Sequence, residues 1–271
     1  MPDIFDANAH VYIKTEGKLG RIVLNRLARK NALTQAMWNA IPDAVSVLND
    51  MPDVSVIILC SSSDSAFAAG ADLKELQEIS KDPARCESNR VALRDAQRAL
   101  ARSPKPVIAE IAGPCMGGGC GLAIHCDFRI ASTNAKFGVT PAKLGIIYPL
   151  NDTKELMDLV GVSNTKKLLF TAQHINGAQA LEIGLIDQLV SPEMLHDVTE
   201  AFAAQMTAVS QYSIRGMKWT IQQILDGQID DDDETAAMFC AAHEGEDAIE
   251  GMNAFLEKRK PNFRWTHPAK D

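Results

Sequence analysis

Two short segments of the 271-residue chain carry small residues where a helix is expected to begin: AFAAGADLKEL (66–76) and IAGPCMGGGCGLAIHCDFRIAS (111–132). In each, an apolar strand pattern stops and Ala or Gly residues lead into the first helical turn. Backbone N–H groups at such a turn have no partner within the helix and lie at its positive end. Ala71 and Gly118 stand at these two helix starts. If both N–H groups converge on one oxygen, they form an oxyanion hole, in which each donor is worth ~3–4 kcal/mol for a carbonyl oxygen that gains negative charge.

The glycines of the second segment match neither common nucleotide-binding pattern. Gly113 and Gly118 have the spacing of a phosphate-binding loop, but Gly119-Cys120 stands where that loop has Lys followed by Ser or Thr. No register of residues 117–121 gives the dinucleotide pattern G-x-G-x-x-G. A dinucleotide-dependent oxidoreductase is therefore set aside. For each loop taken alone, a tight turn or a close helix–strand crossing remains the structural alternative.

Composition and charge exclude several classes of protein. The chain is 46% hydrophobic and 23% charged, which is typical of a globular protein and not of a disordered one. Its 27 Lys and Arg against 35 Asp and Glu give a net charge of −8, which argues against a broad nucleic-acid-binding face. No apolar run reaches the roughly 18–20 residues of a membrane span, and the acidic start, MPDIFDANAH, has no leader pattern. We expect a soluble, cytoplasmic protein with no nucleic-acid or membrane partner.

The six cysteines predict neither a disulfide framework nor a metal site. In the cytoplasm we expect them to be free thiols. Cys115, Cys120 and Cys126 form the only cluster, and the four- and five-residue gaps between them match no common zinc spacing. They are interpreted as small buried hydrophobic residues, and no metal is expected.

The first two-thirds of the chain alternates strand and helix patterns. Thr34 is the expected N-cap of a helix that buries one face. VSVIILCSS (54–62) is a continuous apolar run, typical of a strand that is buried on both faces. Strands are expected at 10–17, 19–26, 54–62, 106–113, 128–133 and 136–139, and helices at 34–51, 72–80, 83–103 and 120–127.

From about residue 191 the patterns are helical, and no further strand is expected after Leu189–Val190. The acidic run Asp230–Glu234 is interpreted as a loop and helix start. We expect a core at 1–200 and a helical region at 201–271.

Read together in this order and spacing, the two segments resemble the crotonase superfamily, the enoyl-CoA hydratase/isomerase family. LNRLARKNAL (24–33), LLFTAQHINGAQALEIGLIDQLV (168–190) and EGMNAFLEKRKPNF (250–263) resemble further signatures of that family, so the resemblance covers nearly the whole chain. It implies an α/β fold, the crotonase (ClpP-like) spiral of repeated ββα units, with an acyl-CoA pocket in the core. It also implies a C-terminal helical trimerisation region and a homotrimer or dimer of trimers.

The resemblance also implies site residues. The ligand would be an acyl-CoA substrate, with coenzyme A as the substrate carrier and no permanently bound cofactor. Its two oxyanion donors fall on Ala71 and Gly118. Basic residues of the C-terminal helix, Lys258–Lys260, would contribute from a neighbouring subunit. Coenzyme A would lie along Arg26, Ala28, Arg29 and Lys30 and along Ala69, Asp72, Leu73 and Lys74, with Lys74 near a phosphate.

The sequence departs from the family at the positions of its two hydratase glutamates. One lies three residues after the oxyanion glycine, which here is Gly121, and the other corresponds to Pro141. Neither residue can ionise, although general acid–base groups typically contribute about 10²–10⁴ in rate. Tyr148 follows a TP-x-x-LG-x-x-Y pattern (140–148) that resembles the methylmalonyl-CoA decarboxylase branch. That branch, however, has a histidine where this chain has Ala71, and it keeps the glutamate at the position of Gly121.

Tyr148 is therefore the third candidate catalytic residue, able to orient a carboxylate or a water, and a buried tyrosine bonded to backbone is the alternative. His125 is interpreted as a core histidine and Asp127 as a cap or turn residue. Asp152 is expected to be the N-cap of the following helix, with Glu155 completing a capping box.

Three functions remain open. The first is hydration or isomerisation of an enoyl-CoA. The second is decarboxylation of a malonyl-type CoA, which requires less proton machinery because the departing CO₂ leaves its electron pair behind. The third is a non-catalytic acyl-CoA-binding protein that has lost its acid–base pair.

Overall fold

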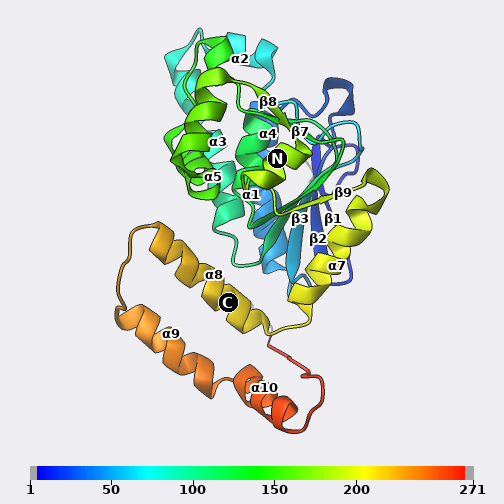
Figure 1. Cartoon of the computed structure of the whole chain (residues 1–271), viewed down its shortest axis with the longest axis vertical. Helices are drawn as coiled ribbons and strands as arrows, with labels where there is room; N and C mark the ends of the chain where they lie inside the picture. The colour runs from blue at the N-terminus through cyan, green and yellow to red at the C-terminus, as the bar shows by residue number, and fades with distance from the viewer. Residues whose placement is uncertain (1–4, 266–271) are drawn as a thin grey trace.

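The computed structural model describes residues 5–265 and is built on a twisted six-stranded sheet in the order β1-β2-β3-β4-β6-β9 (Figure 1). β1 and β2 form an antiparallel hairpin, and the other neighbouring pairs are parallel. Its strands are β1 (Val11–Glu16), β2 (Leu19–Leu24), β3 (Val56–Ser61), β4 (Val107–Ile111), β6 (Phe128–Ser132) and β9 (Gln188–Val190).

The apolar run at 54–62 is buried on both faces, as predicted, because helices cover the sheet on two sides. Ile57 and Leu59 of β3 belong to a large core that includes Trp38 of α1 (Gln35–Asp50). Ile58 alternates with them and packs in a second core beneath α7 (Leu195–Thr207). The other helices of the large core and its surroundings are α2 (Leu73–Ile79), α3 (Pro83–Ala101), α4 (Gly118–Ile124), α5 (Leu150–Thr171) and α6 (Gly177–Glu182).

A small second sheet lies beside the large one and was not predicted in full. It has the order β5-β7-β8, and only β7 (Lys136–Gly138) was expected. β5 (Cys115–Met116) and β8 (His174–Asn176) are too short to show a periodic pattern in the sequence. The chain also forms single 3₁₀ turns at Leu27–Arg29, Pro141–Leu144 and Pro192–Met194.

The expected helices are present, with small shifts of their ends. Thr34 caps α1 as predicted, because its side chain accepts a hydrogen bond from the Met37 N–H. α4 begins at Gly118, where the small residues predicted a helix start, and two residues before the helical pattern at 120–127. Asp232, within the acidic run, caps α9 (Asp233–Glu244).

The interpretation of Asp152 as an N-cap is wrong. α5 begins at Leu150 with Pro149 in the cap position, and no side chain caps it. Asp152 is therefore already inside the first turn, and its side chain is buried beside α3 and not turned back to the helix end.

The C-terminal helices α8 (Gln211–Leu225), α9 and α10 (Glu246–Leu256) form an arm beside the main body (Figure 1). Two ion pairs connect α8 and the residue that follows it to the body, Lys218–Asp127 at 2.6 Å and Arg102–Asp226 at 2.7 Å. Apolar side chains on this arm are exposed in the isolated chain, among them Met217, Ile221, Ile224, Phe239, Met252 and Phe255. The division at about residue 200 and the assembly of several chains stay predictions.

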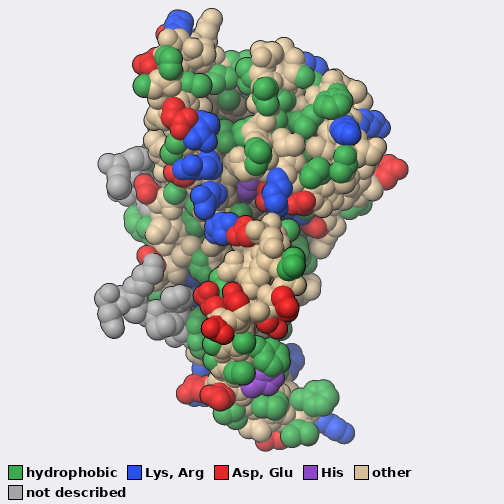
Figure 2. Space-filling model, turned by 90° about the vertical axis from the view of Figure 1, so that its left-hand side faces the viewer, with side chains coloured by type: hydrophobic (Ala, Val, Ile, Leu, Met, Phe, Trp, Pro, Cys, Tyr) green, Lys and Arg blue, Asp and Glu red, His purple; other side chains and the backbone are tan. Residues whose placement is uncertain are grey.

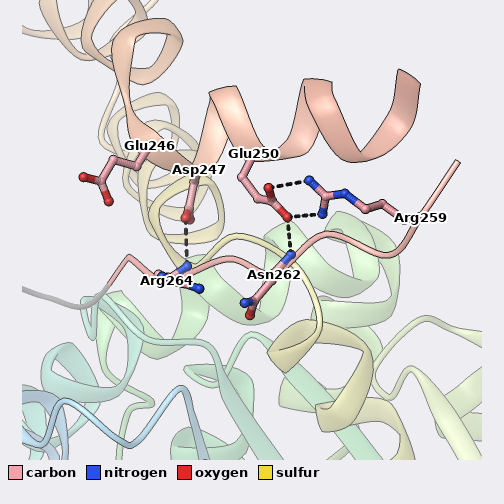
Figure 3. Close-up of a pocket in the computed structure, with 6 residues that line it drawn as sticks. All are labelled: Glu246, Asp247, Glu250, Arg259, Asn262 and Arg264. Carbon is pink, nitrogen blue, oxygen red and sulfur yellow. Dashed lines mark hydrogen bonds and ion pairs between the residues drawn. The ribbon is translucent and has the colours of Figure 1, made fainter. Parts of the chain in front are cut away.

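The segment after α10 folds back along that helix (Figure 3). Arg259 forms an ion pair with Glu250 at 2.6 Å, and the Asn262 N–H donates to the same carboxylate at 2.7 Å. The backbone N–H of Arg264 donates to Asp247, which helps to close a cavity of about 310 Å³. The charge of Arg259, one of the three basic residues assigned to a neighbouring site, is thus already paired within its own chain.

Among the described residues, no helix combines the length and the apolar composition that crossing a bilayer requires. Within the same residues, no three His, Cys, Asp or Glu side chains converge as metal ligands.

Candidate active site

Backbone hydrogen bonds join the loop after β3 to the loop after β4. The Met116 N–H donates to the Ala68 carbonyl oxygen at 2.9 Å. In the other direction, the N–H groups of Phe67 and Ala68 both donate to the Pro114 carbonyl oxygen at 3.1 Å. The two segments that the sequence singled out therefore lie side by side, although about 50 residues separate them.

The N–H groups of Ala71 and Gly118 are left without a backbone partner within residues 5–265. One neighbour of each is engaged: the Asp72 N–H donates to the Leu33 carbonyl at 2.9 Å, and the Gly117 N–H donates to the Gly138 carbonyl at 2.8 Å. The N–H groups of the other two neighbours, Gly70 and Gly119, have no backbone partner among the described residues either. Ala71 and Gly118 line the same cavity. Two unpaired donors at one cavity are the arrangement that an oxyanion hole requires.

The glycines of this region are required by close packing. A Cβ at Gly118 would lie 2.9 Å from Cζ2 of Trp38, and a Cβ at Gly119 would lie 2.7 Å from the Ala68 carbonyl oxygen. Gly117 has φ 48°, a left-handed conformation that favours glycine. Gly119 is therefore explained by close packing of the helix on the neighbouring loop, which was the structural alternative to a catalytic role. Gly118 combines close packing with a free N–H.

The cavity, which we call the main cavity, has a volume of about 1110 Å³. It lies between the two joined loops, α2, α3 and the segment 140–152, and its lining is mostly apolar. At this size it exceeds the usual range of roughly 300–1,000 Å³ for ligand pockets. It can therefore hold a large ligand with an apolar part.

Four basic residues also line the main cavity, and the sequence analysis did not assign them to the ligand: Arg90, Arg94, Arg98 and Lys143. The three arginines recur every four residues on α3, so they share one side of the helix. Figure 2 shows Lys and Arg side chains gathered in a band on one face, beside apolar side chains. We call these three arginines and Lys143 the basic edge of the main cavity. The four-residue spacing of the arginines was the signal in the sequence that could have identified it.

Only part of the predicted coenzyme A-binding set lines the main cavity. Ala69, Asp72 and Leu73 do, whereas Lys74 does not. Asp72 caps α2 by accepting hydrogen bonds from the Lys74 and Glu75 N–H groups, and these bonds, with the adjacent Arg26, lower its pKa. Asp72 is thus a structural residue as well as a lining one.

The segment 26–30 flanks the joined loops without lining the main cavity, so Arg26, Ala28, Arg29 and Lys30 stand outside the lining. The Arg26 guanidinium pairs with Asp72 at 2.8 Å and donates to the Ala32 carbonyl at the same distance. The Lys30 carbonyl accepts the Ala69 N–H at 2.9 Å. This segment supports the loop that carries Ala71.

Tyr148 lines the main cavity, and its hydroxyl oxygen is buried without a hydrogen-bond partner among the described residues. The alternative of a tyrosine bonded to backbone is therefore wrong for this structure. Burial, with the nearby Asp152 carboxylate, raises the Tyr148 pKa well above its usual value. The phenol stays protonated at neutral pH and can donate to a bound group.

Asp152 also lines the main cavity and is almost completely buried. Burial raises its pKa to about 7, although the hydrogen bond from Gln97 opposes the shift. The folded protein therefore holds this proton more tightly than the unfolded chain does. Between the unfolded pKa of about 4 and the folded value, the contribution of Asp152 to stability falls as pH rises.

His125 and Asp127 have structural roles, as expected. His125 is buried in the core, its Nδ1 lies 2.6 Å from the Gly121 carbonyl oxygen, and burial lowers its pKa to about 4. The ring is therefore neutral at pH 7 with a proton on Nδ1, because a carbonyl oxygen can only accept. The Asp127 carboxylate accepts the Val107 N–H at 2.7 Å and pairs with Lys218.

Comparison with known proteins shows the family of the chain. Residues 14–266 match the family model described as enoyl-CoA hydratase/isomerase. The chain belongs to the enoyl-CoA hydratase/isomerase family. It is 38% identical over 258 residues to a crotonyl-CoA hydratase of Syntrophomonas wolfei, covering 95% of this chain and 98% of the relative. It is 33% identical to the methylmalonyl-CoA decarboxylase of Escherichia coli, covering 94% of this chain and 97% of that one.

Solved structures of the family share the fold. A crystal structure of an enoyl-CoA hydratase/isomerase family protein from Hyphomonas neptunium superposes with a TM-score of 0.92 at 38% identity, covering 95% of this chain and 98% of that one. The expected α/β crotonase fold is thereby confirmed, and in this chain it consists of two sheets followed by C-terminal helices. The resemblance to both the hydratase family and the decarboxylase branch is confirmed as well.

The unpaired N–H of Gly118 can be tested with a matched pair of variants. Gly118→Pro removes the N–H, whereas Gly118→Ala keeps it and adds the same Cβ against Trp38. We expect kcat of the Pro variant to fall about 10²–10³-fold below that of the Ala variant. Circular dichroism and thermal unfolding verify that both variants fold. Equal activity in the two folded variants would contradict a catalytic role for this N–H.

Proposed function

We propose that the protein binds an acyl-CoA thioester and stabilises the enolate of that thioester between the N–H groups of Ala71 and Gly118. The proposal rests on one observation: two backbone donors without partners line the same cavity. A thioester oxygen placed between them would gain hydrogen bonds as its charge develops. The family membership and the CoA substrates in the names of the relatives point the same way.

Charge and shape suggest how coenzyme A would bind. The phosphates would lie toward two groups of basic residues. One group lines the main cavity: Arg90, Arg94, Arg98 and Lys143. The other lies outside the lining and consists of the segment Arg26–Lys30 and Lys74. The chain nearer the thioester would pass Ala69, Asp72 and Leu73. Local cations on a protein of net charge −8 allow a small polyanion to bind selectively.

Among the reactions of such an enolate, we propose decarboxylation of a malonyl-type CoA. The bond between the α-carbon and the carboxylate breaks, CO₂ departs, and the electron pair moves to the thioester oxygen held by Ala71 and Gly118. Tyr148 supplies a buried phenol with a free hydrogen-bonding capacity, suited to orienting the substrate carboxylate. The reaction needs no base to activate water, which agrees with Gly121 and Pro141 at the positions of the hydratase glutamates.

Hydration of a short enoyl-CoA is the second candidate. It is favoured by a buried carboxyl at the main cavity, Asp152, which could accept a proton from water, and by the 38% identity to a crotonyl-CoA hydratase. Isomerisation would require the same group to move a proton between two carbons. A protein that binds acyl-CoA without turnover is the remaining outcome.

A side-by-side assay with methylmalonyl-CoA and crotonyl-CoA separates these functions. We expect release of CO₂ from methylmalonyl-CoA at the higher kcat/KM. Tyr148→Phe should lower that value about 10–100-fold, because one hydrogen bond to a charged group is lost. Fast hydration of crotonyl-CoA that Tyr148→Phe leaves unchanged would refute the decarboxylase proposal. Binding of both esters without turnover would show a non-catalytic protein.

We further propose that the region 201–271 carries the contacts between subunits of a homotrimer or dimer of trimers. Met217, Ile221 and Ile224 lie at spacings of four and three residues on α8, so they share one side of that helix, and all three are exposed in the isolated chain. An apolar stripe of this kind is costly in water and is typical of a helix that packs against a partner.

The apolar stripe on α8 predicts that a charged side chain placed within it weakens the association of subunits. Sedimentation of the wild-type protein should give a mass that is a multiple of three chains. Ile221→Glu should shift the protein toward single chains because it would bury an unpaired charge in the contact. The matched control is Gln223→Glu, two residues further along the same helix and outside the stripe. A monomeric wild-type protein, or an Ile221→Glu variant with unchanged mass, would overturn the assignment.

A further inference from the structure

The carboxyl group of Asp152 stands against Gly121, the position where hydratases of the family carry one of their glutamates. A Cβ built on Gly121 would lie 3.0 Å from Oδ1 of Asp152 and 2.9 Å from Nε2 of Gln97. Both atoms occupy space that any side chain at residue 121 would need. The carboxyl missing from α4 is thus replaced in space by one from the first turn of α5.

Hydrogen bonds hold this carboxyl in one orientation. Oδ1 accepts from Nε2 of Gln97 at 2.7 Å, and Oε1 of Gln97 in turn accepts from Nδ2 of Asn151 at 2.5 Å. Oδ2 has no hydrogen-bond partner among residues 5–265, and Asp152 lines the main cavity together with Tyr148. One oxygen is therefore fixed by the protein while the other remains available.

Within the described residues, no cation is bonded to Asp152 that would keep its carboxyl group ionised. His125 Nδ1 lies 3.7 Å from Oδ1, but that ring is neutral because of its burial. Glu155, on the same helix, adds negative charge that raises the Asp152 pKa, and Tyr148 is a protonated phenol without charge. The basic residues Arg94, Arg98 and Lys143 line the same cavity. With a pKa of about 7, Asp152 is populated in both protonation states near neutral pH.

We propose that Asp152 is the proton donor that quenches the enolate, delivering its proton to the α-carbon of the acyl group. The step rests on the proposed function, since it requires an acyl-CoA enolate in the main cavity. The O–H bond of Asp152 breaks, a C–H bond forms with the electron pair of the enolate, and the thioester carbonyl is restored. The carboxylate then takes up a proton from water. In the reverse direction, the same carboxylate removes an α-proton from a saturated acyl-CoA.

The reverse direction gives a test that does not depend on decarboxylation. Propionyl-CoA is incubated in D₂O with the wild-type protein, and exchange of its α-hydrogens is followed by NMR. We expect one of the two α-hydrogens to exchange selectively, because a fixed carboxyl reaches one face of the enolate. Asp152→Asn keeps an oxygen for the Gln97 hydrogen bond and removes the acid, so exchange should fall at least about 100-fold.

Asp158→Asn is the matched control, since it removes an exposed carboxyl on the same helix that pairs with Lys154, and it should leave exchange unchanged. A second comparison separates chemistry from packing. Asp152→Ala with Gln97→Ala removes both groups that would crowd a side chain at 121, so adding Gly121→Glu to this pair should recover exchange relative to the pair alone. A purely structural Asp152 would not be rescued in this way.

The outcomes for the two proposals are distinct. No exchange by the wild-type protein, or full and selective exchange by a folded Asp152→Asn variant, overturns the role of Asp152. Exchange that depends on Asp152 without CO₂ release from methylmalonyl-CoA supports that role and rejects the decarboxylation. When methylmalonyl-CoA is decarboxylated in D₂O, Asp152→Asn should also lose the single-handed placement of deuterium in the product.

Discussion

The short backbone ladder between Ala68 and Met116 is the contact on which the site depends. It is formed by residues about 50 positions apart, and it fixes the ends of two loops that leave two neighbouring parallel strands, β3 and β4, of the large sheet. The ladder and the flanking bonds use up several of the surrounding N–H groups, and those of Ala71 and Gly118 are among the ones that face no backbone acceptor within the described residues. The small residues follow from the same constraint, since α4 packs so closely on the first loop that Gly119 has no room for a Cβ.

Two polar groups that line the main cavity, Tyr148 and Asp152, and the buried His125 beside Asp152 are kept neutral or close to neutral by burial. Tyr148 is held protonated, His125 is held uncharged, and Asp152 is poised near pH 7, in each case because burial disfavours the charged form. Such a set suits a substrate that brings its own negative charge and needs one proton. It suits less well a reaction that requires two ionised carboxylates.

Much of the fold and half of the site could be predicted from the sequence. Long periodic segments such as α1 and the apolar run of β3 are determined by local pattern, and the joined loops carry motifs that place Ala71 and Gly118. Asp152 could not be placed in this way, because Asp-x-x-Glu near a helix start is also a capping signature. Only the packing of α5 against Gly121 and Gln97 turns its side chain inward. The arginines of α3 were not assigned to the ligand for a different reason. Arginines at a four-residue spacing are usual on any solvated helix, so the spacing alone does not indicate a binding site.

The most direct test of the central claim is the vibrational spectrum of a bound thioester that does not turn over. Butyryl-CoA labelled with ¹³C at its carbonyl would be bound to the wild-type protein, and the C=O stretching frequency compared with that of the free ester in water. Two fixed N–H donors should polarise the carbonyl more strongly than water does, which lowers the frequency. A frequency equal to or higher than that of the free ester, with the ester shown to be bound, would contradict an oxyanion hole formed by Ala71 and Gly118.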